Sequence, residues 1–155
     1  MARARARVSV RFDTGRLDEY ARRLPTVGKE AAQEIAHSIR DVASQIAPKD
    51  TTSLSQSIYV SDGEDSDYSE RAGAAEAVND NVVILEEIRP EFAISLSGGP
   101  AATYTVVVGV AASHGIFQEY GTATMSPQPY FTPAIEPSRD AFQRDFERRL
   151  KELSP

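Results

Sequence analysis

The chain has 155 residues and a formal net charge of −6, with 23 acidic and 17 basic side chains. This length fits one domain with a single core, and the negative charge argues against general nucleic-acid binding, which depends on Lys and Arg neutralising phosphates. The chain contains no cysteine and two histidines, so we expect no disulfide framework, no metal site and no cofactor. No apolar run approaches the ~20 residues of a membrane span, and no apolar signal segment follows the arginine-rich start. We therefore expect a protein made in the cytoplasm that does not contact a membrane.

Residues 2–12 alternate strictly between small or apolar side chains and polar ones. A period of two predicts an extended strand, and four arginines share one of its faces. In one interpretation this arm leads into an edge strand whose arginine face is solvated. In the other, the arginines contact DNA or an acidic neighbouring subunit. The candidate contact residues are Arg3, Arg5, Arg7 and Arg11.

Apolar residues at helical spacing predict two helices in the next part of the chain. A short one covers 17–24 and ends before Pro25, and a longer one covers 27–46 with a polar outer face. Pro48 disfavours helical geometry at the preceding residue and marks the end of the second helix. His37 points away from the centre of the apolar stripe. This favours a surface histidine over a metal ligand, because further ligands are scarce.

The composition changes sharply after a polar turn at 47–57 and a strand that begins at Ile58. Residues 61–80 contain seven acidic side chains and one arginine, and they have too few apolar groups to offset the entropy cost of ordering. We predict a mobile acidic loop at 61–80. A solvated hairpin extension is favoured over a calcium site, because residues 62–67 lack the ligand register of an EF-hand loop.

Three apolar, β-branched runs at 82–85, 92–96 and 103–110 predict an antiparallel meander of three or four strands. Gly98 and Gly99 suit a hairpin turn between two of them and lack the wider spacing of a phosphate-binding loop. A helix from the amino-terminal half can then cover one face of the sheet.

The last helix is predicted at 134–153, because Pro133 and Pro137 suit a first helical turn and an apolar stripe follows them. The expected fold class is α+β, in which an antiparallel sheet of three to five strands packs against a long helix of the amino-terminal half and a carboxy-terminal helix. Residues 1–155 form a single domain in this prediction.

The segment between the last strand and the last helix carries the candidate interaction surface. Phe117 and Tyr120 are at helical spacing before Gly121, which fits a helix cap with positive φ, and prolines fix φ in the loop that follows. A rigid apolar loop loses little entropy on binding. In the alternative interpretation, the rings at 130 and 131 fill the core. The candidate interface residues are Glu119, Tyr120, Gly121, Thr122, Pro127, Pro129, Tyr130 and Phe131.

No catalytic residue is predicted. Ser113 and His114 are adjacent, and adjacent residues of an extended chain point to opposite sides, so these two do not form a nucleophile and base pair. The chain is therefore predicted not to be an enzyme. A small hydrolase that uses His114 with a distant carboxylate is the remote alternative.

Three blocks of the chain, in order, resemble the tail-completion or neck proteins of long-tailed bacteriophages. Residues 47–58, Ala-Pro-Lys-Asp-Thr-Thr-Ser-Leu-Ser-Gln-Ser-Ile, resemble the family's Ala-Pro-x-Asp-Thr-Gly-x-Leu-x-x-Ser-Ile block, with Thr52 at the glycine position. Residues 108–109 and 119–122, Val-Gly and Glu-Tyr-Gly-Thr, are similar to the second block, although His-Gly at 114–115 stands near its usual Tyr-Ala. Residues 127–134, Pro-Gln-Pro-Tyr-Phe-Thr-Pro-Ala, are similar to the third block, which precedes the last helix.

The resemblance covers most of the chain from Val27 onward and excludes residues 2–12 and 61–80. It implies a non-catalytic α+β subunit that assembles into a sixfold or twelvefold ring at the neck of the virion, between head and tail. Its partners would be copies of itself, the adjacent connector or stopper protein, and the tail terminator or tail tube. DNA would pass through the lumen without sequence-specific binding. The alternative within the virion is a tail terminator that caps the tail tube.

Overall fold

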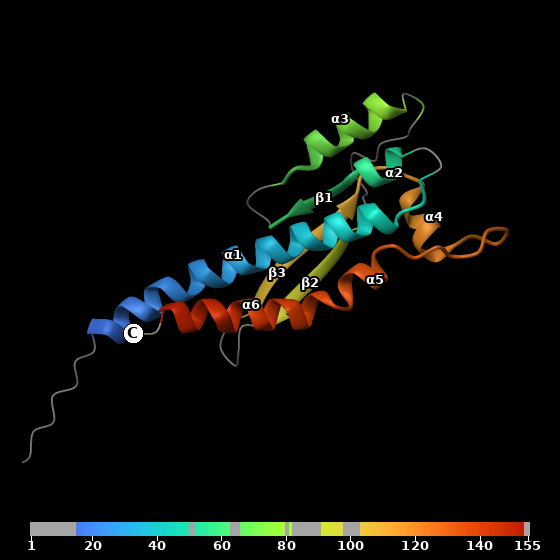
Figure 1. The fold of residues 1–155 in the computed structure, drawn as a ribbon. Helices are drawn as coiled ribbons and strands as arrows, with labels where there is room; N and C mark the ends of the chain where they lie inside the picture. Colours follow the sequence, from blue (N-terminus) through green and yellow to red (C-terminus); the bar gives the residue numbers. More distant parts are fainter. Residues whose placement is uncertain are drawn as a thin grey trace, which may run out of the picture.

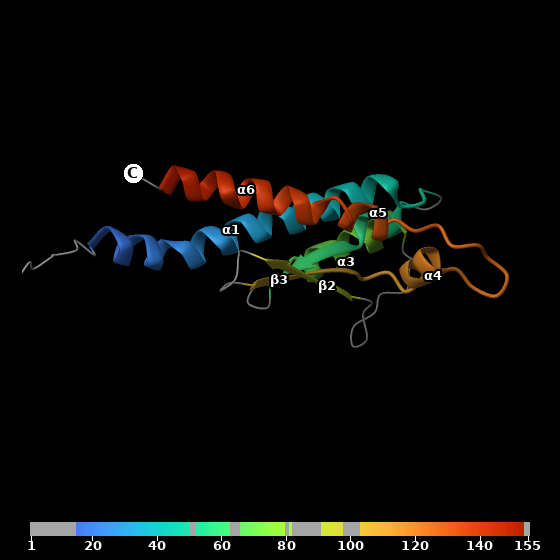
Figure 2. The same ribbon diagram turned by 90° about the horizontal axis from the view of Figure 1, so that it is seen from below.

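The computed structural model describes residues 15–49, 52–62, 66–79, 81, 91–97 and 103–153, without the side chains of 15–17 and 91–97. These residues form two layers, a three-stranded sheet and the two longest helices, α1 and α6, which lie across one face of it (Figures 1 and 2). The predicted α+β class is confirmed. In chain order the elements are α1 (Gly15–Ile46), α2 (Ser53–Gln56), β1 (Ile58–Ser61), α3 (Tyr68–Val78), β2 (Glu91–Ser97), β3 (Thr103–Val110), α4 (Gly115–Tyr120), α5 (Thr132–Ile135) and α6 (Ser138–Leu153).

β3 is the central strand of the sheet, whose order is β1-β3-β2. It pairs antiparallel with β2, so that Glu91 faces Gly109 and Ser97 faces Thr103, and antiparallel with β1 on its other side. The predicted antiparallel pairing of 92–96 with 103–110 is present as β2 and β3. The strands predicted at 2–12 and 82–85 lie outside the described residues.

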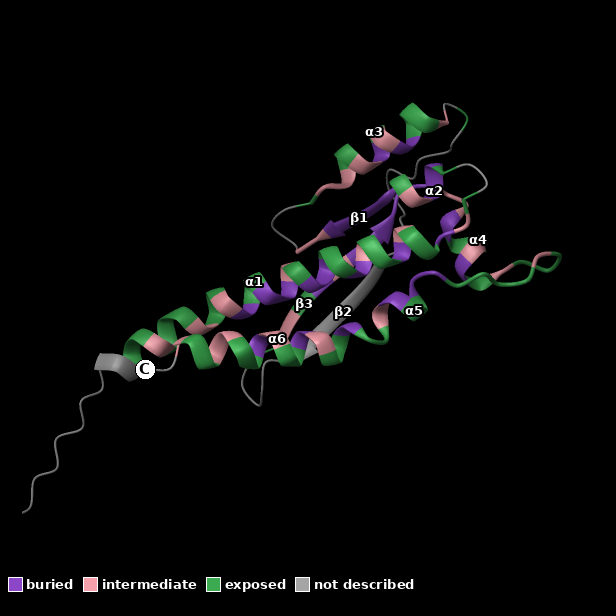
Figure 3. Ribbon diagram, in the orientation of Figure 1, coloured by how far each residue is buried: buried purple, intermediate pink, exposed green. Residues whose placement is uncertain are grey.

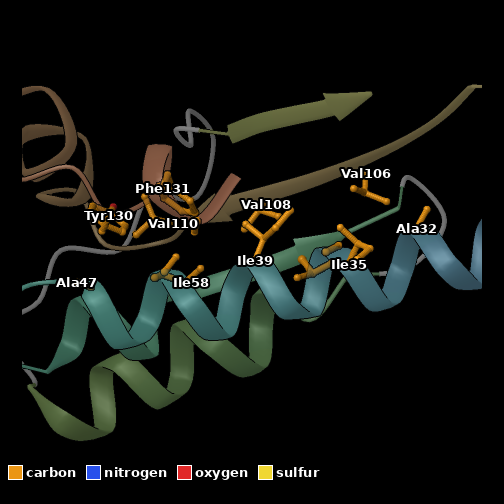
Figure 4. Packing of buried hydrophobic residues seen from close by; sticks show 14 of the residues in the cluster. Ala32, Ile35, Ile39, Ala47, Ile58, Val106, Val108, Val110, Tyr130 and Phe131 are labelled. Atoms are coloured by element: carbon orange, nitrogen blue, oxygen red, sulfur yellow. The ribbon is translucent and has the colours of Figure 1, made fainter. Parts of the chain in front are cut away.

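Alternate residues of β3 face the helix layer and build the core. Val106, Val108 and Val110 are buried there, and the branched side chains Ile35 and Ile39 of α1 pack against them (Figure 4). Figure 3 shows the buried stripe along the side of α1 that faces the sheet. The stripe also contains small residues, which let the helix backbone approach the strands closely; these are Ala31, Ala32, Ala36, Ala43 and Ala47.

α6 completes the helix layer beside α1. Phe142 and Phe146 stack with their ring centroids 5.5 Å apart, and both contact the ring of Tyr104 at the start of β3. Arg149 joins the two helices through an ion pair of 2.6 Å with Glu34. The helix predicted at 134–153 is present as two pieces, α5 and α6, with a break between Ile135 and Ser138.

α1 passes through Pro25, so the predicted break between two helices is wrong. Proline lacks an N–H and costs the interior of a helix about 3 kcal/mol. The carbonyl that loses its partner here belongs to Ala21, which is exposed to water. The Tyr104 hydroxyl donates to the Leu24 carbonyl at 3.4 Å, and the Tyr104 ring packs against Gly28. Packing on both sides of the proline therefore outweighs its local preference.

The mobile loop predicted at 61–80 is also wrong where α3 occupies it. Asp67, the residue before α3, accepts a hydrogen bond from the Val60 N–H at 2.6 Å and forms ion pairs with Arg40 at 3.1 Å and Arg71 at 3.4 Å. Two alanines of α3 are buried against the body of the protein. Composition alone missed the helix because Arg40, which neutralises Asp67, comes from α1, 27 positions earlier in the chain.

Candidate subunit interface

α4 follows the end of β3 and starts a segment that leaves the body of the protein. Its first residue, Gly115, is buried, and a Cβ atom there would lie 2.7 Å from Val110 Cγ1. The Tyr130 hydroxyl donates a hydrogen bond to the Gly115 carbonyl at 3.0 Å. Burial and the nearby charge of Glu119 raise the pKa of Tyr130 far above its usual value, so this hydroxyl stays protonated as a donor. α4 is thereby fixed against the end of the sheet.

Glu119 ties α4 to the beginning of α5. Its Oε2 accepts hydrogen bonds from the backbone N–H groups of Tyr130 at 2.7 Å and Phe131 at 2.9 Å. Its Oε1 accepts from the N–H of Thr132 at 3.1 Å and from the Thr132 hydroxyl at 2.7 Å. Glu119 as a whole residue is 3% exposed, and its carboxylate accepts from N–H groups at the start of α5 that have no acceptor within that helix.

The protonation of Glu119 follows from these contacts. Burial alone would raise the pKa of its carboxyl, but the hydrogen bonds from the Thr132 side chain and from the backbone of Phe131, Tyr130 and Thr132 outweigh burial and lower the pKa below its usual value. Glu119 is therefore charged at neutral pH. Its role is to join the two ends of the loop between α4 and α5.

That loop, residues 121–129, is called the projecting loop. It extends away from the sheet and helices at the end of the molecule opposite the start of α1 (Figure 1). Gly121 opens it with φ of 76°, as predicted, and a Cβ atom there would lie 2.7 Å from the Met125 carbonyl oxygen. The Thr122 N–H donates to that carbonyl at 2.9 Å, and the Gln128 N–H donates to the Gln118 carbonyl at 2.8 Å.

The turn inside the projecting loop is held by one side chain. Thr122 Oγ1 accepts hydrogen bonds from the backbone N–H groups of Thr124 at 3.3 Å and Met125 at 3.1 Å. Pro127 and Pro129 restrict φ in the returning half. Most residues of the projecting loop are exposed (Figure 3). Because backbone groups of the loop are hydrogen-bonded within the chain, it has a defined shape without a partner.

α4 presents an exposed apolar face beside the projecting loop. Ile116 is 40% exposed, Phe117 is 52% exposed and Tyr120 is 63% exposed. Gln118 Oε1 is buried and has no hydrogen-bond partner among the described residues. Buried acceptors of this kind are rare in folded proteins.

The predicted interface residues thus divide into two groups. Tyr120, Gly121, Thr122, Pro127 and Pro129 lie together on α4 and the projecting loop and are exposed or half-exposed.

Glu119, Tyr130 and Phe131 are buried, so placing them at an interface was wrong, and the alternative in which both rings fill the core holds. Glu119 was misplaced because its donors lie 11 to 13 positions later. Ile116 and Phe117 were not among the predicted interface residues, although Phe117 belongs to the segment predicted to carry the surface and both are exposed. Their helical spacing with Tyr120 was the available signal.

The other candidate groups have a simpler outcome. Among the described residues, no group of three or more His, Cys, Asp or Glu is placed to hold a metal ion. Burial lowers the pKa of His114. Arg3, Arg5, Arg7 and Arg11 lie outside the described residues.

Among the described helices, none combines the length and apolar character needed to cross a membrane.

Comparison of the chain with protein-family models, curated proteins and solved structures gave no match. The geometry of α4 and the projecting loop and the sequence blocks are therefore the grounds for a functional proposal.

Proposed function

We propose that this chain is a structural subunit of the neck of a long-tailed bacteriophage, where copies form a ring around the DNA path between the head-side connector and the tail. In this proposal the protein is not an enzyme and belongs to the virion. The single observation that carries the proposal is the projecting loop, which has a fixed shape and stands beside an exposed apolar face of α4.

A ring of identical subunits needs two different complementary patches on each subunit, because head-to-tail contacts close into cyclic assemblies. A loop that projects from the body provides one such patch. Since its hydrogen bonds are already made within the chain, docking it costs little conformational entropy.

The folded arrangement also gives a reason for the sequence blocks on which the family resemblance rests. Glu119 belongs to the second block, and its three backbone donors belong to the third. Thr52 stands at the glycine position of the first block and adopts φ of 57°, a conformation that glycine favours. The blocks therefore coincide with local backbone requirements, which supports the resemblance.

The exposed area of the Phe117 ring sets the expected contribution of this side chain to the binding free energy. About half of Phe117 is exposed, which for an aromatic side chain leaves roughly 100 Å². Covering that area would contribute about 2.5 kcal/mol, or about 60-fold in affinity. The projecting loop adds further area on the same side.

The test is the mass of the assembled protein. Native mass spectrometry of the wild-type chain is expected to give a closed ring, and Phe117→Ser is expected to shift the population to monomers at concentrations where the wild type is assembled. Val78→Ser is the matched control, because Val78 is 48% exposed on α3, away from the loop. Monomers of the wild type, both alone and with neck partners, would contradict the proposal.

The tail terminator is the alternative to be separated from this role. Particles that lack a terminator are expected to carry tails of uncontrolled length, whereas particles that lack a neck ring are expected to leave heads and tails of normal length unjoined. Electron microscopy of particles made without the protein distinguishes the two.

A further inference from the structure

α4 and the projecting loop have no exposed charged side chain. Residues 115–135 contain one charged residue, Glu119, which is buried with its carboxylate bonded to the backbone. Ile116 and Phe117 are exposed within this uncharged stretch. Because the core of a protein contact is depleted of charged residues and rich in aromatic ones, this surface fits a partner surface that is also apolar and uncharged.

Most of the described helix surface does not meet that requirement. Burying a charged group that the partner cannot pair costs free energy, so faces that are dense in charges are excluded. The exposed charged residues of α6 are Arg139, Asp140, Arg144, Glu147, Arg148, Lys151 and Glu152, and those in the first part of α1 include Arg22, Arg23, Lys29, Glu30 and Glu34. On α3 the exposed Val78 is a single apolar side chain two positions from the exposed Glu76.

The last turns of α1 have a different outer face. Val42 is 36% exposed and Ile46 is 45% exposed, and because they are four positions apart they lie on one face of the helix. Gln45, also exposed, adjoins them. Asp41 borders this face and is paired with Arg40 at 2.8 Å. Val42, Gln45 and Ile46, here called the α1 end face, therefore form an uncharged surface with two apolar side chains.

The α1 end face and α4 lie at the same end of the molecule but in different layers. Ala47, directly after α1, belongs to the same core cluster as Tyr130, whose hydroxyl bonds to the Gly115 carbonyl of α4 (Figure 4). Figure 2 shows α4 at the level of the sheet and the end of α1 in the helix layer. Because the two surfaces belong to different layers, one subunit can use both at once to contact two neighbours.

We propose that α4 and the projecting loop of one copy dock on the α1 end face of the next copy. The proposal rests on the proposed ring, for which it names the second patch. The contact is heterologous, because α4 and α1 are different surfaces of the chain. Two α4 faces packed against each other would instead form an isologous dimer and would not continue into a ring.

Mixing two single variants tests this arrangement. Phe117→Ser damages α4 and leaves the α1 end face intact, whereas Ile46→Ser does the reverse. Ile46→Ser is expected to weaken each subunit contact roughly tenfold, because the apolar area of a half-exposed isoleucine is lost from it. Like Phe117→Ser, it is therefore expected to give monomers at concentrations where the wild type is assembled.

The mixture of these variants, tagged with different masses, is expected to give a heterodimer by native mass spectrometry. In it the intact α4 of one chain meets the intact α1 end face of the other, and growth stops there because both remaining surfaces are damaged. The heterodimer is expected to be roughly tenfold more stable than a homodimer of either variant. Val78→Ser is the matched control and is expected to assemble like the wild type.

A cross-linking measurement does not depend on those substitutions, and the absence of cysteine makes it direct. Chains with Ile116→Cys on α4 and chains with Gln45→Cys on α1, tagged with different masses, are mixed and treated with a short bismaleimide. The expected product is a heterodimer that contains both tags. Ser69→Cys on α3 replaces Gln45→Cys in the control and is expected to give only the small yield of random collisions.

The outcomes separate this contact from the ring itself. If the wild type forms rings and Ile46→Ser assembles equally well, or if the Ile116–Gln45 cross-link is no stronger than the control, the α1 end face is not the receiving surface and the ring proposal stands. A mixture without preference for the heterodimer would also overturn the heterologous contact. If the wild type gives only monomers, alone and with neck partners, both proposals fail.

Discussion

Replacing Glu119 by glutamine tests whether one carboxylate holds the projecting loop in place. Glutamine has nearly the same shape, but one of its terminal groups is an NH₂ donor. Each carboxylate oxygen of Glu119 accepts two hydrogen bonds, so whichever oxygen is replaced, two donors lose their acceptor and face another donor. The substitution therefore changes the hydrogen bonding without opening a cavity.

The expected loss follows from the number of bonds. Hydrogen bonds to a charged group contribute about 1.5–3 kcal/mol each, so losing two of them is expected to lower the free energy of unfolding by about 3–6 kcal/mol. Urea denaturation at neutral pH measures this difference. Glu147→Gln on the exposed side of α6 is the control, with an expected change within about 0.5 kcal/mol.

The dependence on pH gives the same reasoning an independent check. The pKa of Glu119 is lower in the folded protein than its usual value, so the unfolded chain binds the proton more tightly. The stabilisation by this charge is therefore fully present above the usual glutamate pKa and is lost as pH falls through the folded pKa. The difference in stability between the wild type and Glu119→Gln should shrink as pH falls through this range. A difference of less than about 1 kcal/mol at neutral pH, or one that stays constant as pH falls, would refute the role given to Glu119.

Two further predictions concern backbone positions. Thr52→Gly is expected to raise the free energy of unfolding by about 0.5–1 kcal/mol, because relief of a left-handed conformation, worth about 1–2 kcal/mol, exceeds the added entropy of glycine in the unfolded chain; a loss of stability in urea denaturation would count against it. Gly109→Ala is expected to lower it by about 1–3 kcal/mol, since the new Cβ would lie 2.4 Å from the buried ring of Tyr59. The same change made beside Tyr59→Leu should cost clearly less by thermal denaturation, and an equal cost would show that the ring is not responsible.

The parts of the fold that the sequence predicted are those that repeat a short local pattern. The period of two in β3 and the apolar stripe of α1 place Val106, Val108 and Ile39 in one core, because each residue's burial follows from its neighbours along the chain. The positive φ of Gly121 was predicted for the same reason, since a glycine directly after a helix commonly adopts one.

The errors arise where distant residues decide the outcome. Pro25 stays within α1 because Tyr104, far along the chain, packs against the adjacent turns. Asp67 orders the acidic segment through Arg40, and Glu119 is buried because of donors that follow the projecting loop. In each case the position of a charged or conformationally restrictive residue depends on a tertiary partner that the local sequence does not show.

The interface candidates divide into exposed and buried residues for a related reason. Tyr120 and Phe131 are both aromatic residues near prolines and glycines, and composition does not distinguish them. The structure separates them by the hydrogen bonds of Glu119, which draw the chain at Phe131 into the core and leave Tyr120 on the surface.

A cryo-electron microscopy reconstruction of the assembled full-length chain tests the proposed ring contact most directly. The expected result is a closed ring in which α4 and the projecting loop of each subunit contact the next subunit, with Phe117 and Tyr120 covered. A ring in which both side chains remain exposed to solvent, or an absence of any ring with or without the neighbouring neck proteins, would contradict the proposed contact.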